Sequence, residues 1–220
     1  MNVLSLFDYT GIMVAPWVEA GHSAVIVDEQ LKGGLSQGGM LAKLGCDVRD
    51  IRLYVTGKPD ILFGFPPCTD LAGCGAKHWA KKRAANPEFQ VEAVALCRVV
   101  ESLGNYWDIP WMMENPVSAL STLWRKPDHW IQPWEYGGYL PVDDVHPEYP
   151  EYIMPRDAYP KKTGIWCGNG FALPDKKPVD VGPGYSTQYK KLGGKSLKTK
   201  NIRSATPRGF ARAVYLANRR

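Results

Sequence analysis

The sequence has no long hydrophobic run. No stretch of the 220 residues approaches the roughly 20 consecutive apolar residues that a helix needs to cross a bilayer. Its start, MNVLSLFDYTG, has no basic segment followed by an apolar one, as a secretory signal would have. These absences predict a protein of the cytoplasm, either of a bacterial cell or of a phage-infected host, with no membrane partner.

Cysteine is scarce and unpatterned. The sequence has five cysteines, at positions 46, 68, 74, 97 and 167, and they form no C-x-x-C pair and have no histidine partner at zinc spacing. An odd number without such spacing predicts reduced thiols rather than a disulfide framework. It also gives no reason to expect a metal site.

Acidic residues are absent from the last 40 positions. None of the 22 Asp and Glu lies after Asp180, whereas ten of the 27 Lys and Arg do. The formal net charge is +5, so a weakly acidic body carries a strongly basic end. Such an asymmetry predicts a polyanionic partner such as nucleic acid. A solvated charged tail is the alternative.

Short apolar runs alternate with amphipathic segments. This alternation is typical of an α/β fold with a mostly parallel sheet and helices on both faces. The expected strands are 2–7, 23–29, 59–65 and 109–115, and the expected helices are 13–21, 86–104 and 206–220. Asp8, Asp28, Cys68 and Glu114 follow or end these strands, at the edge where ligands of parallel sheets bind.

Two segments interrupt the alternation, and we expect both to belong to one domain spanning 1–220. Residues 116–160 are rich in Pro, Trp and Tyr and show no period, which predicts an irregular insertion packed by its aromatic side chains. A base-stacking surface is the less common use of such side chains. Residues 162–168 are expected to return to the sheet, and about 181–205 to form a basic loop.

Five short motifs carry a resemblance to a known family. VLSLFDYTG, VDE, CDV, DILFGFPPC and MMENP occur in this order, and TPRGFARAVYLAN closes the chain. They resemble motifs I, II, III, IV, VI and X of the C5-cytosine DNA methyltransferases, and most closely those of short phage and bacterial members. The resemblance implies a Rossmann-like fold of the S-adenosylmethionine (SAM)-dependent methyltransferase type, with SAM as cofactor.

The chemistry of cytosine explains two of these motifs. C5 of cytosine is a poor nucleophile, but a thiolate that adds to C6 makes C5 enamine-like and able to attack an electrophilic methyl group. We therefore expect Cys68 to be the nucleophile, on a backbone stiffened by Pro66 and Pro67. Glu114 would hydrogen-bond N3 of the base and activate C6. A buried structural cysteine is the alternative reading of Cys68.

The resemblance also implies a cofactor site built from strand ends and loops. Asp28 suits the two ribose hydroxyls, and Asp47 suits the adenine amino group with Val48 against the ring. Motif I departs from the family here, because only Gly11 remains of its usual small residues. The residues expected to bind SAM are Phe7, Asp8, Gly11, Asp28, Asp47, Val48, Phe63 and Gly64.

A family arginine is replaced by lysine. The segment YPKKTGIWCG occupies the place of the motif that carries this arginine, so Lys161 or Lys162 stands in for it, and we assign the role to Lys162. Lysine is a point charge without the bidentate fork of arginine, so its contact with the base or a phosphate would differ.

The family's target-recognition domain has no room in this chain, since only about 169–200 separates the last two motifs. We expect a monomer that acts on duplex DNA with a flipped cytosine and has low or short sequence specificity, resting on phosphate contacts. The residues expected to bind nucleic acid are Lys77, Lys81, Lys82, Arg83, Lys190, Lys191 and Lys195. The alternatives are an RNA cytosine-C5 methyltransferase and a catalytically weak protein that binds SAM or DNA.

Overall fold

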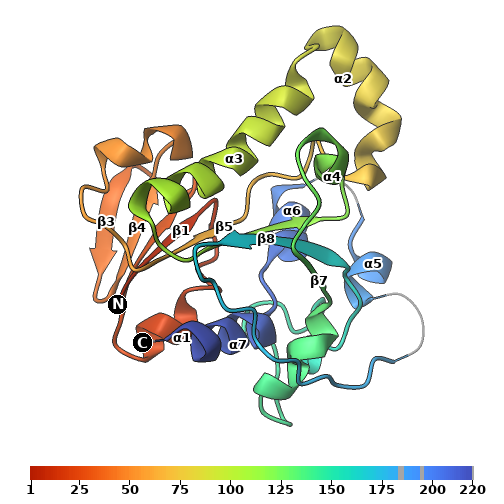
Figure 1. The fold of residues 1–220 in the computed structure, drawn as a ribbon. Coiled ribbons are helices and arrows are strands. Elements are labelled where there is room, and N and C mark those ends of the chain that lie inside the picture. The colour runs from red at the N-terminus through yellow and green to blue at the C-terminus, as the bar shows by residue number, and fades with distance from the viewer. Residues whose placement is uncertain (183–185, 194–195, 220) are drawn as a thin grey trace.

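A single mixed sheet forms the centre of the protein. The computed structural model describes residues 1–182, 186–193 and 196–219 (Figure 1). The strands are β1 (Asn2–Leu6), β2 (Ser23–Val27), β3 (Gly34–Gly38), β4 (Leu41–Gly45), β5 (Ile61–Gly64), β6 (Trp111–Pro116), β7 (His129–Ile131) and β8 (Thr163–Gly168). Their order across the sheet is β3-β4-β2-β1-β5-β6-β8-β7. The five strands from β4 to β6 are mutually parallel, whereas β3, β8 and β7 each run antiparallel to the strand that they join.

Helices cover both faces of this sheet, as the sequence predicts. α3 (Phe89–Trp107) packs on one face, and α1 (Ala15–Glu19) and α7 (Arg208–Asn218) lie together on the other (Figure 1). The shorter helices are η1 (Val48–Leu53), η2 (Gly73–His78), α2 (Trp79–Ala85), α4 (Leu120–Leu123), η3 (Pro133–Tyr139), η4 (Pro155–Asp157), α5 (Thr187–Lys191) and α6 (Leu197–Ser204). The prediction of an α/β fold with a mostly parallel sheet is confirmed.

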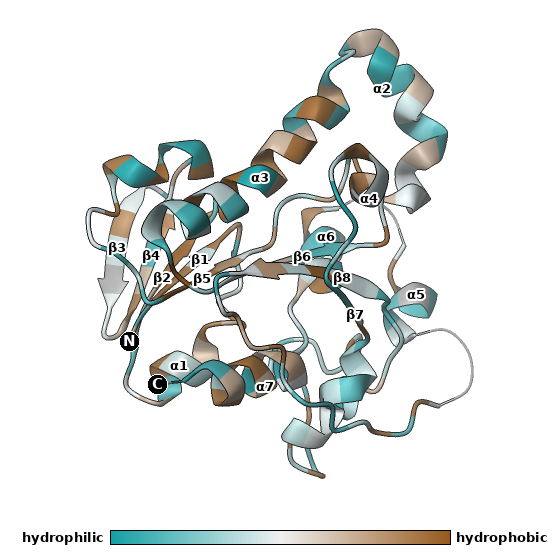
Figure 2. Ribbon diagram, viewed as in Figure 1, coloured by the Kyte–Doolittle hydropathy of each residue, from teal (hydrophilic) through white to brown (hydrophobic). Residues whose placement is uncertain are grey.

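The central strands are apolar on both sides because both of their faces are covered. Leu4 and Leu6 of β1 join the core beneath α3, whereas Val3 of the same strand joins the core beneath α1 and α7. Figure 2 shows β1, β2 and β5 coloured as hydrophobic. Continuous apolar runs are typical of parallel strands buried on both faces. Of the helices in the described parts of the chain, none is long and apolar enough to cross a membrane.

α3 extends beyond the glycine at which the sequence predicts its end. The helix passes through Gly104 and stops at Asp108, which has a φ of 48° and caps it in the left-handed region. A Cβ at position 104 would collide with the side chain of Trp111 on β6. The glycine therefore serves the close approach of helix and strand, and the prediction that it ends the helix is wrong.

The basic segment is more ordered than the predicted loop. It contains α5 and α6, and the side chain of Ser196 caps α6 by accepting a hydrogen bond from the backbone N–H of Thr199 at 3.2 Å. Leu192 and Ile202 are buried in a small apolar cluster with Tyr159 of the insertion. The prediction of a loop from the charge pattern is therefore wrong for α5 and α6.

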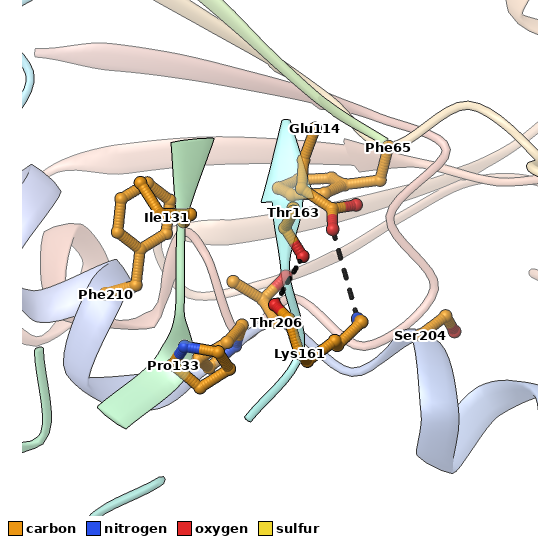
Figure 3. Close-up of a pocket in the computed structure, with 10 residues that line it drawn as sticks. Phe65, Glu114, Ile131, Pro133, Lys161, Thr163, Ser204, Thr206 and Phe210 are labelled. Carbon is orange, nitrogen blue, oxygen red and sulfur yellow. Dashed lines mark hydrogen bonds and ion pairs between the residues drawn. The ribbon is translucent and has the colours of Figure 1, made fainter. Parts of the chain in front are cut away.

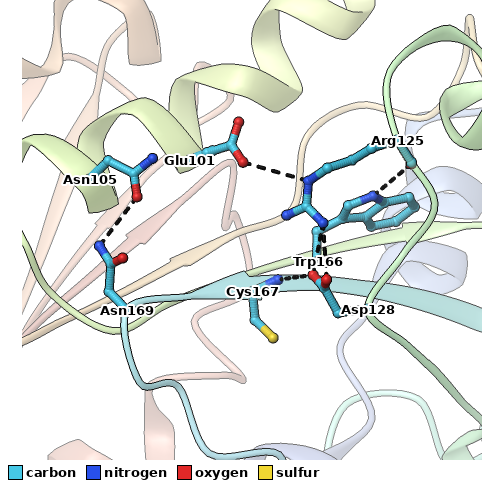
Figure 4. Close-up of polar contacts among 7 residues, drawn as sticks. All are labelled: Glu101, Asn105, Arg125, Asp128, Trp166, Cys167 and Asn169. Atoms are coloured by element: carbon cyan, nitrogen blue, oxygen red, sulfur yellow. Dashed lines mark hydrogen bonds and ion pairs between the residues drawn. The ribbon is translucent and has the colours of Figure 1, made fainter.

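The insertion is anchored to α3 by a polar network (Figure 4). Arg125 lies between two carboxylates: its Nε is 3.5 Å from Glu101 of α3, and its NH1 is 2.9 Å from Asp128. Asp128 in turn accepts a hydrogen bond from the backbone N–H of Cys167 on β8, and Trp166 donates its indole N–H to the Arg125 carbonyl. These contacts fix the chain where it enters β7.

Candidate active site

The sheet register brings the expected site residues to one edge. Leu6 of β1 is paired with Val27 of β2 on one side and with Gly64 of β5 on the other, and Gly64 is paired with Met113 of β6. The residues that come next along each strand therefore form a row at the carboxyl edge. The chain leaves β1 toward β2 and leaves β5 toward β6, in opposite directions, so the boundary between β1 and β5 is the switch point at which α/β sheets bind ligands.

Cys68 lies in a tight turn directly beyond β5. Its carbonyl oxygen accepts hydrogen bonds from the backbone N–H groups of Leu71 at 3.0 Å and Ala72 at 2.8 Å, and the residue is partly exposed. The buried side chain of Asn115 on β6 donates to the carbonyl oxygen of Pro66 at 3.2 Å. This bond ties the cysteine turn to the strand that carries Glu114.

Asn115 has a role that the sequence does not predict, which is to hold the cysteine turn. Successive side chains of a strand point to opposite faces. Asn115 reaches the cysteine turn on one face, and Glu114 therefore points to the other. The signal in the sequence is a polar amide, Asn115, directly after Glu114 at the end of an apolar strand.

Glu114 lines a small pocket between the sheet and the junction of α6 and α7 (Figure 3). Its Oε1 is 3.9 Å from the Nζ of Lys161, which also donates a hydrogen bond to the carbonyl oxygen of Arg203 at 3.1 Å. The lining residues are Phe65, Glu114, Ile131, Pro133, Lys161, Thr163, Ser204, Thr206, Pro207 and Phe210. The cavity measures about 10 Å³, room for one water-sized group, so only the edge of a larger ligand can enter it.

Of the two adjacent lysines, the structure places Lys161 beside Glu114. Lys162 is exposed and turns the other way, with its Nζ 4.7 Å from the centre of the Trp130 ring. The assignment of a catalytic role to Lys162 therefore does not fit the geometry. The physical reason is that neighbouring side chains diverge at the start of β8, and a sequence does not show which one faces the pocket.

The turn after β1 is braced from within. Asp8 is buried, and its carboxylate accepts hydrogen bonds from the hydroxyl of Ser5 at 2.8 Å and the backbone N–H of Gly11 at 2.7 Å. Burial raises the pKa of this carboxyl group. Gly11 has a φ of 70°, which glycine adopts without strain, and Phe7 also has a positive φ, of 56°. Asp8 shapes this turn rather than presenting a free carboxylate to a ligand.

Asp28 is less occupied by the protein's own hydrogen bonds than Asp8. It is half-buried at the tip of β2, where one carboxylate oxygen accepts the backbone N–H of Gln30 at 2.8 Å. Burial raises its pKa, and its charge contributes to the raised pKa of Asp8, so the two carboxyl groups lie near each other. The Gln30 side chain also hydrogen-bonds this carboxylate, whose second oxygen can accept further donors.

Asp47 and Val48 are engaged within the protein. Asp47 caps η1 by accepting the backbone N–H of Arg49 at 2.8 Å and forms an ion pair with the Arg49 side chain. This hydrogen-bonded pair lowers the pKa of Asp47. Val48 is 2% exposed and packs in the core beneath α3. A ligand at this position would have to share Asp47 with Arg49.

Phe63 and Gly64 serve packing. Phe63 is fully buried in the core beneath α1, with its ring 6.2 Å from that of Trp17. A Cβ at Gly64 would collide with Val100 of α3, so the glycine permits the close contact of β5 with this helix. The Phe63 side chain therefore does not line a cofactor pocket, and Gly64 could contribute only its backbone.

The basic residues fall into two groups that come from different parts of the chain. Lys77, Lys81 and Arg83 are exposed on η2 and α2, a helix with no buried residue that projects from the body (Figure 1). Lys82 in the same helix forms an ion pair with Asp70, so its charge is partly neutralised.

Lys190 and Lys191 form the second group, on α5. Lys190 is exposed, and Lys191 donates to the carbonyl oxygen of Glu151 at 3.1 Å. Lys195 lies outside the described residues. Among the residues that the structure does describe, no group of three or more His, Cys, Asp and Glu is placed to hold a metal ion.

Asp157 anchors the start of α7, which lies beside the pocket of Glu114. It accepts the backbone N–H of Gly209 at 2.8 Å at the start of α7, close to Asp144, which is bound by Arg208 at 2.7 Å. Burial raises the pKa of Asp157 to about 6. Because this pKa is raised above the ordinary value of 3.8, the folded state holds the proton more tightly than the unfolded state, and stability falls as the pH rises from about 4 to about 6.

Asp157→Asn is therefore expected to remove part of this pH dependence. The asparagine oxygen still accepts the Gly209 N–H, but no buried charge forms, so up to about 3 kcal/mol of unfolding free energy should be retained above pH 6. Urea denaturation at pH 4.5 and pH 7.5 measures the difference between wild type and variant. Asp143→Asn, at an exposed position beside Asp144, is the control. A pH slope equal to that of the wild type would contradict the assignment.

The fold and the site together define an α/β protein. The turn at Cys68, the ion pair of Glu114 with Lys161 and the carboxylate of Asp28 all lie at the carboxyl edge of its parallel strands. No model of a known protein family matches the chain, and no curated protein matches its sequence. Among solved structures, it is similar to a candidate DNA modification methyltransferase encoded within a prophage of E. coli, with a TM-score of 0.40 and 13% sequence identity. That match covers 76% of this chain and 46% of the other, so the chain spans less than half of its length.

Proposed function

We propose that the protein is a SAM-dependent methyltransferase that acts on C5 of cytosine in DNA. The observation that carries the proposal is the joining of the Cys68 turn to Glu114 through the hydrogen bond from Asn115 to Pro66. This bond ties the Cys68 turn to the strand that carries Glu114, and we infer that the target base lies at this point of the carboxyl edge. A base placed there would have Cys68 on one side and Glu114 on the other. The proposed SAM site at the ends of β1 and β2 would lie next to it.

In this proposal the two residues act together on the base. Glu114 hydrogen-bonds N3 and draws electrons from the ring, so that the Cys68 thiolate adds to C6. A bound SAM would supply an electrophilic methyl group to the electron pair that this addition delivers to C5, and its sulfur would leave with the electrons of the broken S–CH3 bond, as S-adenosylhomocysteine. Loss of the C5 proton then expels the Cys68 thiolate and restores the double bond. Lys161, held by the Arg203 carbonyl, keeps Glu114 oriented toward the base.

SAM would supply an electrophilic methyl group. The residues at the ends of β1 and β2 fit this cofactor in part. The second oxygen of Asp28 can accept ribose hydroxyls, and the left-handed backbone of Gly11 permits a close approach to the main chain. Asp8 acts indirectly, by fixing that turn. Asp47 is the weaker element of the proposed site because Arg49 already engages it.

Asp28→Ala is expected to weaken SAM binding by about 1–3 kcal/mol, the cost of leaving buried polar partners without their hydrogen bonds. Isothermal titration calorimetry with SAM measures this change. Glu29→Gln alters the neighbouring exposed acid and should leave the affinity unchanged. If wild type and Asp28→Ala bind SAM with equal affinity, the SAM site does not include Asp28.

The nucleic-acid partner follows from the charge of this edge. α2 and the basic segment from α5 onward carry exposed lysines on either side of the proposed base position, and phosphate contacts of this kind position a strand without reading its sequence. We propose that one domain of the chain, acting as a monomer, performs the reaction on a cytosine flipped out of duplex DNA.

Incubation with tritiated SAM and, in parallel, with duplex DNA, RNA or free dCMP tests this function. The proposal predicts label in the DNA alone. Label in RNA would assign the same chemistry to another substrate. The absence of label from all three, in a preparation that binds SAM, would contradict methyl transfer to cytosine.

A further inference from the structure

The surface beside the site contains one unusual tryptophan. All eight tryptophans lie in the described part of the chain, and Trp130 on β7 is the exposed one, at 39%. The other aromatic residues of the insertion mostly pack inside, as the sequence predicts: Tyr136 and Tyr159 are buried, and Trp124 stacks on Trp166. Packing accounts for those residues and does not account for Trp130.

A cation lies on this ring. The Nζ of Lys162 is 4.7 Å from the ring centre, within the range of a cation–π contact. Lys126 is exposed on the same segment, and the acid between it and the strand, Asp128, is already paired with Arg125. The ring therefore lies beside lysine charge and is partly open to solvent, and aromatic rings beside positive charge bind single-stranded nucleic acid.

The register places this ring close to the proposed base position. Trp130 is paired with Gly164 of β8, and Gly164 is paired with Asn115 of β6, so Trp130 and Asn115 share a face of the sheet. Two strand spacings separate them, about 10 Å. Asn115 is the residue that holds the Cys68 turn. A strand whose target base reaches Cys68 therefore passes within reach of Trp130.

The ring is also held in place before any ligand arrives. β7 is bonded to β8, and the backbone N–H of Asp128 donates to the carbonyl oxygen of Ile165 at 2.9 Å. The network around Arg125 fixes the entry to the strand (Figure 4). Little conformational freedom remains to be lost when a base stacks on such a surface, which favours binding.

We propose that Trp130 is a stacking platform for an unpaired base next to the target cytosine, that Lys162 moves from the ring to the phosphate of that nucleotide, and that the site therefore accepts single-stranded as well as duplex DNA. The inference rests on the proposed function and assigns a residue outside the catalytic chemistry to substrate binding. Stacking tolerates any base because every base has a π face, so the platform adds affinity without adding sequence specificity.

The test measures binding of a fluorescein-labelled single-stranded 12-mer with one central cytosine by fluorescence anisotropy, at several salt concentrations. Trp130→Ala should weaken binding about 5- to 150-fold at every salt concentration, because stacking releases no counterions. Trp130→Phe should keep most of the affinity. Lys162→Gln should instead flatten the salt dependence by about 0.7 in log K against log[salt].

Tyr106 of α3 provides a matched control. It is 62% exposed and carries the guanidinium of Arg52 at 4.2 Å from its ring centre, so it is a second exposed aromatic–cation pair at the opposite end of α3 from α2. Tyr106→Ala should leave the affinity unchanged. Equal affinities for Trp130→Ala and Tyr106→Ala would overturn the proposal, as would a wild-type protein that binds no oligonucleotide.

This binding assay is independent of turnover, so the two proposals can fail separately. If the affinity depends on Trp130 but tritiated SAM labels no nucleic acid, the stacking platform stands and the proposed function falls. If DNA is methylated but Trp130→Ala binds as the wild type does, the function stands and the platform falls.

Discussion

Cys68→Ser is expected to abolish methyl transfer to DNA, lowering the turnover number by roughly 10⁴-fold or more. The hydroxyl of serine is a far weaker nucleophile than a thiolate near neutral pH, and no step of the proposed reaction proceeds without addition to C6. The turn itself should persist, because backbone bonds from Leu71 and Ala72 and the Asn115 side chain hold it. SAM affinity and thermal stability should therefore match the wild type.

Cys167→Ser is the matched control for this variant. Cys167 is also a partly exposed thiol, but it lies on β8, and its contact in the polar network is made by its backbone N–H. Methyl incorporation from tritiated SAM should continue in Cys167→Ser. Activity in Cys68→Ser comparable to that of the control would remove the Cys68 thiol from the mechanism.

Glu114→Gln is expected to lower the turnover number by about 10²–10⁴-fold, the usual contribution of a general acid or base. Glutamine keeps the size of the side chain and one hydrogen-bonding oxygen, but it cannot supply a proton to N3, and it loses the ion pair with Lys161. The effect should fall on the turnover number more than on the Michaelis constant for DNA, because activation of C6 develops in the transition state.

Steady-state kinetics with tritiated SAM separate these two constants. Glu88→Gln, an exposed acid just before α3, controls for the change in net charge. An unchanged turnover number in Glu114→Gln would show that C6 is activated by another group. A changed Michaelis constant alone would reduce Glu114 to a binding residue.

The strand ends were predictable from the sequence because buried parallel strands are short apolar runs. The runs before Asp28, Cys68 and Glu114 stop where polar residues or prolines begin, and parallel strands bring such ends to one edge. The sequence alone therefore predicts that these strand ends lie near one another. The β3–β4 hairpin was not predicted, since its strands contain several glycines and lack a clear alternation.

Two of the failures share a cause, which is side-chain direction. Phe63 lies in an expected site strand but faces the core beneath α1, and Lys162 rather than Lys161 was assigned to the pocket. One residue of offset reverses the face of a strand. Gly104 reads as a helix stop because glycine commonly follows helices, yet here it makes room for Trp111. Packing partners distant in sequence decide such cases.

Mass spectrometry of a trapped complex tests the central claim most directly. A duplex with 5-fluorocytosine at the target cannot lose fluorine as it loses the C5 proton, so the adduct at C6 should persist. Incubation with SAM should yield a species with the mass of protein plus methylated oligonucleotide, and peptide mapping should place the bond at Cys68. The account is contradicted by a preparation that methylates ordinary DNA yet forms no adduct, or by an adduct that also forms in Cys68→Ser.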